Sequence, residues 1–208
     1  MKSIQVMNQK GQCKIQQINK KEKLILSDVD GVMLDWETGF HTWMKLRGYD
    51  RVRNGLWHIE SSYNMPKDRA YQLLNEYNTS AYMSMIPPFR DARSGIAQLV
   101  EAGYRFKLIT AIGTDSTVKQ MRSMNIDYFF GKEAFIDLIC VDIGADKEKE
   151  LVLYKDSNLP WIEDNIKNYY AGNSVGLSSI LMNHPYNMDD SVNCRVDNWG
   201  QIVSLLLS

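Results

Sequence analysis

Two aspartates separated by a single residue follow the first compact apolar run of the chain. The run Leu24–Ser27 ends at Asp28, and Asp30 and Gly31 come directly after it in the sequence DVDG. Because alternate residues of an extended chain point the same way, both carboxylates can reach one pocket, and Gly31 allows a turn whose N–H groups can bind an anion. An Asx turn with solvated carboxylates explains the two aspartates equally well when they are taken alone.

Three further polar sites follow or precede apolar runs. Thr110 closes RFKLIT, Lys147 stands just ahead of a helical pattern, and Glu163 and Asp164 end LPWIED. A hydroxyl group at a strand end can hold a phosphate oxygen, and adjacent carboxylates concentrate negative charge that a hard cation compensates. Ordinary roles stay open for each site: strand propensity for Thr110, a solvated helix start for Lys147, and capping of the following helix by Asp164 or Asn165.

The elements around these sites alternate between strands and helices. Strands are expected over 24–27, 105–110, 135–143, 159–164 and 178–183, and helices over 91–102, 148–156, 165–172 and 199–207. A further helix is expected to start at Asp115 or Ser116 and to carry Val118, Met121 and Met124. This alternation predicts βαβ units, and therefore an α/β fold whose parallel sheet is covered by helices on both faces. Ligands of such sheets bind outside the carboxyl ends of the strands, which is where the polar sites fall.

Two segments do not fit the alternation. Residues 36–88 interrupt it directly after the first strand and carry two helical patterns, so we expect an inserted helical cap. The first 23 residues are rich in Gln, Asn and Lys, and form either a short hairpin around Lys10-Gly11-Gln12 or a partly disordered arm. The expected domains are therefore an N-terminal arm (1–23), a core (24–35 and 89–208) and a cap (36–88).

Composition excludes several classes of function. The 208 residues include 24 Lys and Arg against 25 Asp and Glu, and 44% are apolar. This near-neutral charge argues against non-specific nucleic-acid binding, and the apolar runs fall far short of the ~18 residues that cross a bilayer. The polar start lacks the apolar core of a signal peptide, so we expect a cytoplasmic protein with no membrane partner. We also expect a monomer or a homodimer.

The three cysteines are Cys13, Cys140 and Cys194, an odd number at wide and unpatterned spacing. Disulfide frameworks and zinc sites show even numbers or regular spacing. We therefore expect three reduced thiols.

In their order along the chain, DVDG, a strand-end threonine, a helix-start lysine and a strand-end ED resemble the four motifs of the haloacid dehalogenase-like hydrolase superfamily, most of whose members are phosphatases. The resemblance covers about residues 24–188 and is most specific in LILSDVDGVMLD and LPWIEDNIKNYYAG. Near the C-terminus, WIEDN followed by SVGLSSILMNHPYN is similar to the 5′-nucleotidase branch that includes the 5′(3′)-deoxyribonucleotidases. The resemblance implies a three-layer Rossmann-like core with a small helical cap after the first strand.

The resemblance also implies a mechanism. Asp28 is expected to attack phosphorus and form an aspartyl-phosphate, which divides one hard hydrolysis into two easier displacements. Asp30 is expected to protonate the leaving group and later to take a proton from water. Thr110 and Lys147 are expected to hold the phosphoryl oxygens.

Mg²⁺ is the implied cofactor. Two carboxylates and a phosphate repel one another by about 4 kcal/mol per pair at 4 Å, and Mg²⁺ prefers a few carboxylates together with substrate phosphate. The family pattern assigns the metal to Asp28, the backbone carbonyl of Asp30, and Asp164. Glu163 is then a supporting partner or an alternate ligand.

Two features depart from the pattern. Ala111 follows Thr110 where the nucleotidase relatives often carry a side-chain donor, so Ala111, like Gly31, is expected to contact phosphate through its backbone. Lys149 and Lys155 also lie upstream of LPWIED, although register against the family favours Lys147.

The substrate is expected to be a small phosphate monoester, and a nucleoside monophosphate in particular. Phe40, Trp43 and Trp57, with His58 and Tyr63, can form an aromatic slot that stacks on a base. Aromatic residues at helical spacing also form the core between helices, which is the more common case. A phosphosugar or other small metabolite, or a binding module without turnover, are the alternative functions. The sequence His184-Pro185-Tyr186-Asn187 either lines the site entrance or only turns the chain.

Overall fold

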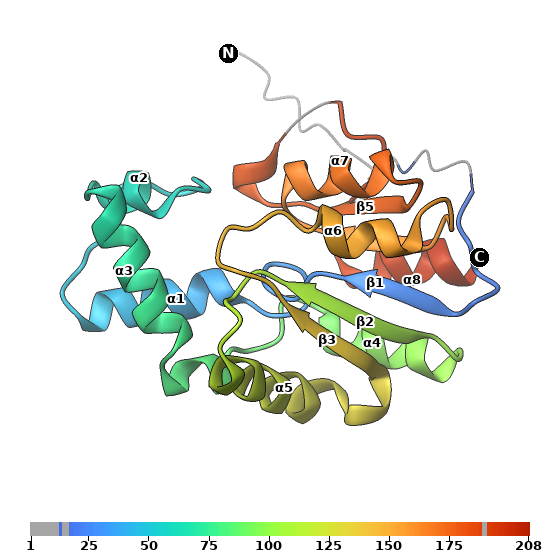
Figure 1. Ribbon diagram of the computed structural model, residues 1–208, viewed down its shortest axis with the longest axis horizontal. Helices are drawn as coiled ribbons and strands as arrows, with labels where there is room; N and C mark the ends of the chain where they lie inside the picture. Colours follow the sequence, from blue (N-terminus) through green and yellow to red (C-terminus); the bar gives the residue numbers. More distant parts are fainter. Residues whose placement is uncertain (1–12, 14–16, 189–190) are drawn as a thin grey trace, which may run out of the picture.

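The computed structural model describes residues 13, 17–188 and 191–208 and contains a six-stranded sheet of order β3-β2-β1-β4-β5-β6. All neighbouring strands are parallel (Figure 1). The strands are β1 (Leu24–Ser27), β2 (Arg105–Thr110), β3 (Phe135–Cys140), β4 (Pro160–Glu163), β5 (Ser178–Met182) and β6 (Arg195–Val196). The predicted α/β class with a parallel sheet is confirmed.

Successive strand residues alternate between two apolar cores, which places helices on both faces of the sheet. Ile25 packs with side chains of α4, α5 and α8, whereas its neighbour Leu26 packs with side chains around α6 and α7. Trp161 and Ile162 of β4 divide in the same way. The helices of the two faces are α4 (Ala92–Glu101), α5 (Ser116–Phe130), α8 (Trp199–Leu207), α6 (Glu148–Leu151) and α7 (Ile166–Ser174). The molecule therefore has three layers.

Two of the core helices, α5 and α8, begin where polar side chains bind the free N–H groups of the first turn. Asp115 accepts hydrogen bonds from the backbone of Thr117 and Val118 at the start of α5, and Asn198 accepts one from Gln201 at the start of α8. Such caps satisfy donors that have no partner inside the helix. The expected starts of both helices are thus confirmed.

Two expected helices have different ends. The α-helical part of 148–156 stops at Leu151 and continues as a 3₁₀ helix (Val152–Tyr154). Gly172 does not end α7, which runs on to Ser174. Gly172 instead lies where a Cβ would come within 2.4 Å of Trp161 and 2.5 Å of Ser179, so the glycine is needed for close packing against the sheet.

Between β1 and α4 the chain forms α1 (Trp36–Leu46), α2 (Ile59–Tyr63), α3 (Lys67–Asn78) and a 3₁₀ helix (Ala81–Met85). Figure 1 shows these helices beside the sheet, at the end where the strand arrows point. Phe40 and Trp43 lie on one face of α1 and contact the Tyr77 ring of α3, with ring centroids 5.3 and 5.5 Å away. All three rings are at most 1% exposed, so they form the core of this helical segment.

The cysteine prediction is wrong at two of three positions. Cys13 and Cys194 form a disulfide bond across 181 residues of sequence, and Cys140 is a free thiol. The two cysteines are brought together by an antiparallel bridge beside β6, a tertiary contact that spacing along the chain does not encode. The expected hairpin around residues 10–12 lies outside the described residues.

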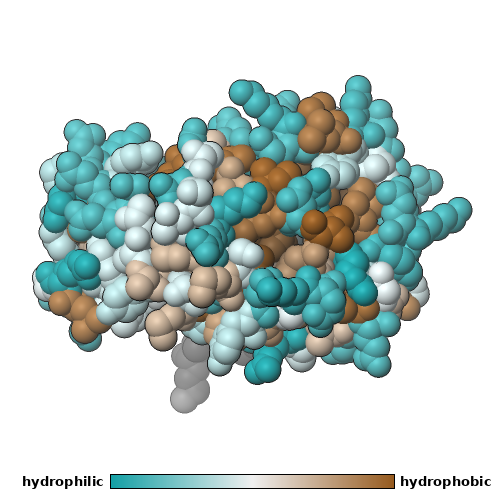
Figure 2. Space-filling model, turned by 60° about the horizontal axis from the view of Figure 1, so that its bottom comes forward, coloured by the Kyte–Doolittle hydropathy of each residue, from teal (hydrophilic) through white to brown (hydrophobic). Residues whose placement is uncertain are grey.

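The face drawn in Figure 2 is largely hydrophilic at its edges, and hydrophobic side chains gather toward its middle. None of the helices in the described part of the chain combines the length and the apolar character that crossing a membrane requires. The oligomeric state and the cytoplasmic location stay predictions.

Candidate active site

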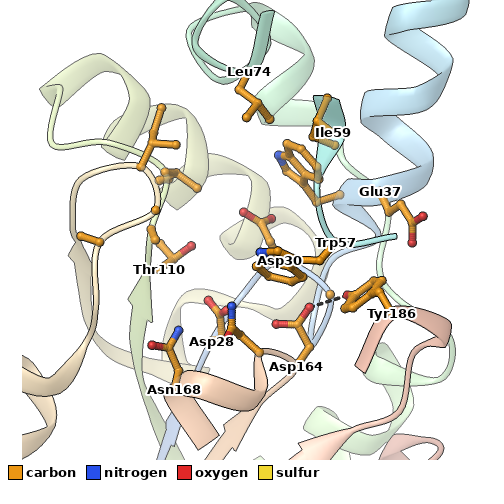
Figure 3. Close-up of a pocket in the computed structure, with 18 of the residues that line it drawn as sticks. Asp28, Asp30, Glu37, Trp57, Ile59, Leu74, Thr110, Asp164, Asn168 and Tyr186 are labelled. Carbon is orange, nitrogen blue, oxygen red and sulfur yellow. Dashed lines mark hydrogen bonds between the residues drawn. The ribbon is translucent and has the colours of Figure 1, made fainter. Parts of the chain in front are cut away.

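The register of the sheet brings the predicted chemical residues to one edge. Ser27 of β1 pairs with Leu108 of β2 and with Ile162 of β4. The carboxyl ends of these three adjacent parallel strands therefore lie at nearly the same level. Asp28, Thr110 and Asp164 stand at those ends, within two residues of one another in register. Figure 3 shows these three side chains around one pocket. Strand order and parallel direction thus assemble the site from segments more than 130 residues apart.

Lys147 is the cation at the centre of this cluster. Its Nζ lies 2.7 Å from Asp28 Oδ2 and 3.2 Å from Glu163 Oε1, and the side chain is 1% exposed. Burial would lower the lysine pKa, but the charges of Asp28 and Glu163 outweigh burial and raise it, so the ammonium group keeps its charge. Lys149 and Lys155 make no described contact with Asp28 and do not line the pocket, so Lys147 is the lysine that the structure places here.

Glu163 is held entirely by protein groups. Its Oε1 accepts hydrogen bonds from Lys147 and from Asn168, at 2.6 Å, while Oε2 accepts from the backbone N–H of Asp164 at 3.0 Å. Burial, reinforced by the charge of Asp28, raises the Glu163 pKa well above its usual range. With both oxygens occupied, Glu163 fits a supporting role better than that of a metal ligand.

Asp164 has one oxygen tied to the protein. Tyr186 donates a hydrogen bond to its Oδ2 at 2.5 Å. Burial and the neighbouring Asp28 charge raise the pKa of Asp164 to about 7, while the bond from Tyr186 opposes that rise. Tyr186 lines the pocket, so the HPYN segment does more than turn the chain.

Asp30 binds Arg122, a residue outside the four motifs. Arg122 of α5 is fully buried, and its Nη2 lies 2.7 Å from one carboxylate oxygen of Asp30 and 2.8 Å from the other. Burial raises the Asp30 pKa to about 6, although the Arg122 charge lowers it. A usable signal was present: Arg122 falls on the same helical face as Val118 and Asn125, and a cation on a buried face requires a buried anion.

The carboxylates fit a hard divalent cation. Single oxygens of Asp28, Glu163 and Asp164 all lie within 4.8 Å of one another, and all three residues are buried. Lys147 faces this cluster, and burial, reinforced by the charge of Asp28, raises the pKa values of Glu163 and Asp164. Carboxylate oxygens are the ligands that Mg²⁺ prefers, and Asp28 and Asp164 are the residues that would hold it.

The cluster lies at the base of a cavity of about 410 Å³. Thr110, Ala111 and Gly31 also line it, and the Thr110 hydroxyl is buried with no hydrogen-bond partner among the residues that the structure describes. An unpaired buried hydroxyl is costly, so a ligand oxygen at this place would restore its hydrogen bond. The helical segment supplies the opposite wall, which contains Trp36, Glu37, His41, Leu56, Trp57, Ile59, Leu74 and Asn78.

Of the tryptophan and phenylalanine residues predicted to form a base-binding slot, one lines the cavity and two lie in the core. Trp57 lines the cavity and is 48% exposed. Phe40 and Trp43 are fully buried and are not part of the cavity wall, so the structure does not bring them to the site. The physical reason is their helical spacing, which turns both rings toward α3.

The metal-free protein is expected to lose stability as the pH rises from about 4 to about 7. Folding raises the pKa of Asp164 from 3.8 to about 7, so its contribution is fully present below pH 3.8 and is lost as the carboxyl ionises. Urea unfolding in a chelator at pH 5 and pH 8 measures this fall, and Mg²⁺ should reduce it. Asp164→Asn should show a smaller fall than the wild type. Asp146→Asn is the control, because Asp146 lies in the same pocket but is exposed. An equal loss of unfolding free energy between pH 5 and pH 8 in Asp164→Asn and in Asp146→Asn would contradict the raised pKa of Asp164.

Comparisons with known proteins agree on the fold. A haloacid dehalogenase-like family hydrolase from Streptococcus pneumoniae superposes with a TM-score of 0.65 at 15% identity, covering 88% of this chain and 97% of that one. A protein described as a predicted phosphatase from Clostridium acetobutylicum gives 0.62 at 16% identity, with the same coverage of 88% and 97%. The L-2-haloacid dehalogenase of Xanthobacter autotrophicus gives 0.58 at 10% identity, covering 89% of this chain and 98% of that one. The chain has the haloacid dehalogenase-like fold.

Sequence comparison adds less. No protein-family model matches the chain. The uncharacterized 32.4 kDa protein of the Gp30-rIII intergenic region of Enterobacteria phage T4 is 25% identical in a match of 137 residues that covers 60% of this chain and 47% of the phage protein. The match therefore spans about half the length of that relative. The haloacid dehalogenase-like fold is shared by phosphatases and dehalogenases, so the reaction has to be argued from the side chains.

Proposed function

We propose that this protein is a Mg²⁺-dependent phosphomonoesterase that works through an aspartyl-phosphate. The observation that carries the proposal is the Asp28 carboxylate, held 2.7 Å from the buried Lys147 ammonium at the base of the cavity and beside Asp164. A nucleophile, a cation that stays charged and a second carboxylate for a metal are the groups that phosphoryl transfer requires.

The proposed reaction has two displacements. Asp28 attacks phosphorus, the bond to the leaving oxygen breaks, and Asp30 gives that oxygen a proton. Asp30 then takes a proton from water, whose oxygen attacks phosphorus and releases Asp28 and inorganic phosphate. Lys147 and the Thr110 hydroxyl hold the phosphoryl oxygens in both steps. When bound, Mg²⁺ would neutralise negative charge between the carboxylates and the phosphate.

The side chains favour phosphate hydrolysis over dehalogenation. A departing halide needs no proton, whereas a departing alkoxide does, and Asp30 is placed two residues after Asp28 with its pKa raised to about 6. A cluster of three buried carboxylates also suits a cation and a phosphate, and has no evident use in halide release.

We further propose a nucleoside monophosphate as the substrate and residues 36–88 as the cap that selects it. Trp57 supplies an aromatic surface to the cavity, and Leu56, Ile59 and Leu74 make the same wall apolar. A planar base suits such a wall, since base stacking on aromatic side chains contributes about 1–3 kcal/mol. The similarity of WIEDN and HPYN to the nucleotidase branch supports the same choice.

Phosphate release from a panel of substrates tests the proposal. Nucleoside monophosphates, deoxynucleotides, sugar phosphates and p-nitrophenyl phosphate are compared with Mg²⁺ and with a chelator. Metal-dependent turnover that is fastest on nucleotides is expected. Faster turnover of sugar phosphates would replace the substrate class, and no turnover of any compound would favour a binding module.

Trp57→Ala is expected to raise the KM for a nucleoside monophosphate by about 10-fold or more, because the stacking surface is lost. At saturating Mg²⁺, the kcat and the KM for a sugar phosphate should change little. Tyr71→Ala is the matched control, since Tyr71 is an aromatic residue of α3 that is 53% exposed and lies outside the pocket. Equal KM values for Trp57→Ala and Tyr71→Ala would remove Trp57 from substrate binding.

A further inference from the structure

A chain of contacts links the cap to the acidic cluster through Tyr186. We propose that Tyr186 is a positioning residue that fixes Asp164 as a metal ligand, and that Trp57 holds Tyr186 in place from the cap. Metal binding and the position of the cap loop would then be coupled. This inference rests on the metal site of the proposed function, but not on the identity of the substrate.

The hydroxyl group of Tyr186 determines how Asp164 is oriented. It donates to Oδ2 of Asp164 at 2.5 Å, as the dashed line in Figure 3 shows. Because this bond occupies one carboxylate oxygen, the other oxygen is the one left for a cation. Hydrogen bonds of this kind orient a metal ligand and raise its affinity for the metal, and their loss typically costs 10–100-fold in metal affinity.

The segment that carries Tyr186 is fixed to the core on both sides. His184 Nε2 lies 2.7 Å from the Gly31 carbonyl oxygen, and the His184 ring stacks on Tyr186 with centroids 4.6 Å apart. Asn187 donates from Nδ2 to the Asp164 carbonyl oxygen at 2.7 Å. The same short segment thus binds both the side chain and the main chain of Asp164, as a rigid support requires.

Gly31 leaves the space that this arrangement needs. A Cβ at Gly31 would lie 2.3 Å from Asp164 Oδ2 and 3.1 Å from the Tyr186 hydroxyl. The φ angle of Gly31 is +74°, which side-chain-bearing residues rarely adopt. The turn after Asp30 therefore packs directly on the bonded pair of Asp164 and Tyr186.

The cap reaches the same segment from the other side. The Trp57 ring meets Tyr186 edge to face, with centroids 5.2 Å apart. Two residues earlier, Gly55 approaches Pro185 so closely that a Cβ would lie 3.1 Å from the Pro185 Cβ. Trp57 stands in the loop between α1 and α2 and is 48% exposed, so it can leave Tyr186 without unfolding the core. Contact with Trp57 is proposed to favour the position of Tyr186 in which it binds Asp164, and thereby to raise the affinity for the metal. Linkage then requires that bound metal favour the contact between Trp57 and Tyr186 by the same factor.

Calorimetric titration with Mg²⁺ alone, without substrate, tests the inference. Tyr186→Phe keeps the ring and removes the hydroxyl, and should weaken Mg²⁺ binding by about 10-fold or more. Tyr128→Phe is the matched control, because Tyr128 is 81% exposed on α5 and outside the pocket. Equal Mg²⁺ affinities for Tyr186→Phe, Tyr128→Phe and the wild type would overturn the role of Tyr186.

The cap contact is tested by Trp57→Ala, which replaces a half-exposed side chain and should fold even if Tyr186→Phe does not. We expect a several-fold weaker Mg²⁺ affinity than in Tyr71→Ala, and little additional loss when Trp57→Ala is combined with Tyr186→Phe, since both act through one contact. Additive effects, or no effect of Trp57→Ala, would overturn the coupling. A wild-type protein that binds no Mg²⁺ would overturn the whole inference. Tight Mg²⁺ binding without phosphate release from any substrate would instead overturn the proposed function.

Discussion

Asp28→Asn is expected to abolish phosphate release, with kcat reduced by about 10⁴-fold or more, because the amide oxygen cannot serve as the covalent nucleophile. The substitution is nearly isosteric. Its oxygen can still accept the hydrogen bond that Asp28 Oδ1 receives from the Val29 N–H group at 2.7 Å. Lys147 loses one anionic partner but keeps Glu163. The loss should therefore be chemical and not a loss of folding.

Turnover of a nucleotide and of p-nitrophenyl phosphate with Mg²⁺ measures this effect, and circular dichroism with urea unfolding confirms the fold. Brief reaction followed by denaturation and mass analysis should detect a phosphorylated chain in the wild type and none in Asp28→Asn. Retention of more than a few per cent of the activity would mean that another group attacks phosphorus.

Lys147→Met is expected to abolish phosphate release and to lower the free energy of unfolding. The buried ammonium group separates the carboxylates of Asp28 and Glu163, and breaking a buried ion pair by removing one partner typically costs about 3–5 kcal/mol. The penalty should be larger at pH 8 than at pH 5. Glu163 has a raised pKa, so at low pH it can become neutral, while at high pH it must stay buried with a charge and no cation.

Urea unfolding of the metal-free protein at both pH values measures the stability change, and phosphate release at saturating Mg²⁺ measures the activity. Lys167→Met is a matched control because Lys167 lines the same cavity, with a side chain that is 73% exposed and paired with Asp146. Similar losses for the two lysine variants would show that Lys147 has no special place in the site.

The sequence by itself determined the fold class and which candidate site residues lie at the ends of strands. Asp28, Thr110 and Asp164 each follow an apolar run, and alternating runs and helical patterns allow little except a parallel sheet. In a parallel sheet all the carboxyl ends lie at one edge, so the residues that follow strands can be assigned to that edge from the sequence, while the strand order decides which of them are neighbours. Local patterns were sufficient because the signal for each element and the residue that follows it lie within a few positions.

Only the tertiary structure decided which side chains face one another. Three lysines lie between β3 and β4, and the contact with Asp28 distinguishes Lys147 from the others. Arg122 reaches Asp30 across 92 residues, and Cys13 joins Cys194 across 181. Trp57 lines the cavity while the aromatic residues of α1 fill a core. These contacts depend on how segments distant in sequence pack together. The charge or apolar character of a buried residue shows that it needs a partner, but does not identify that partner.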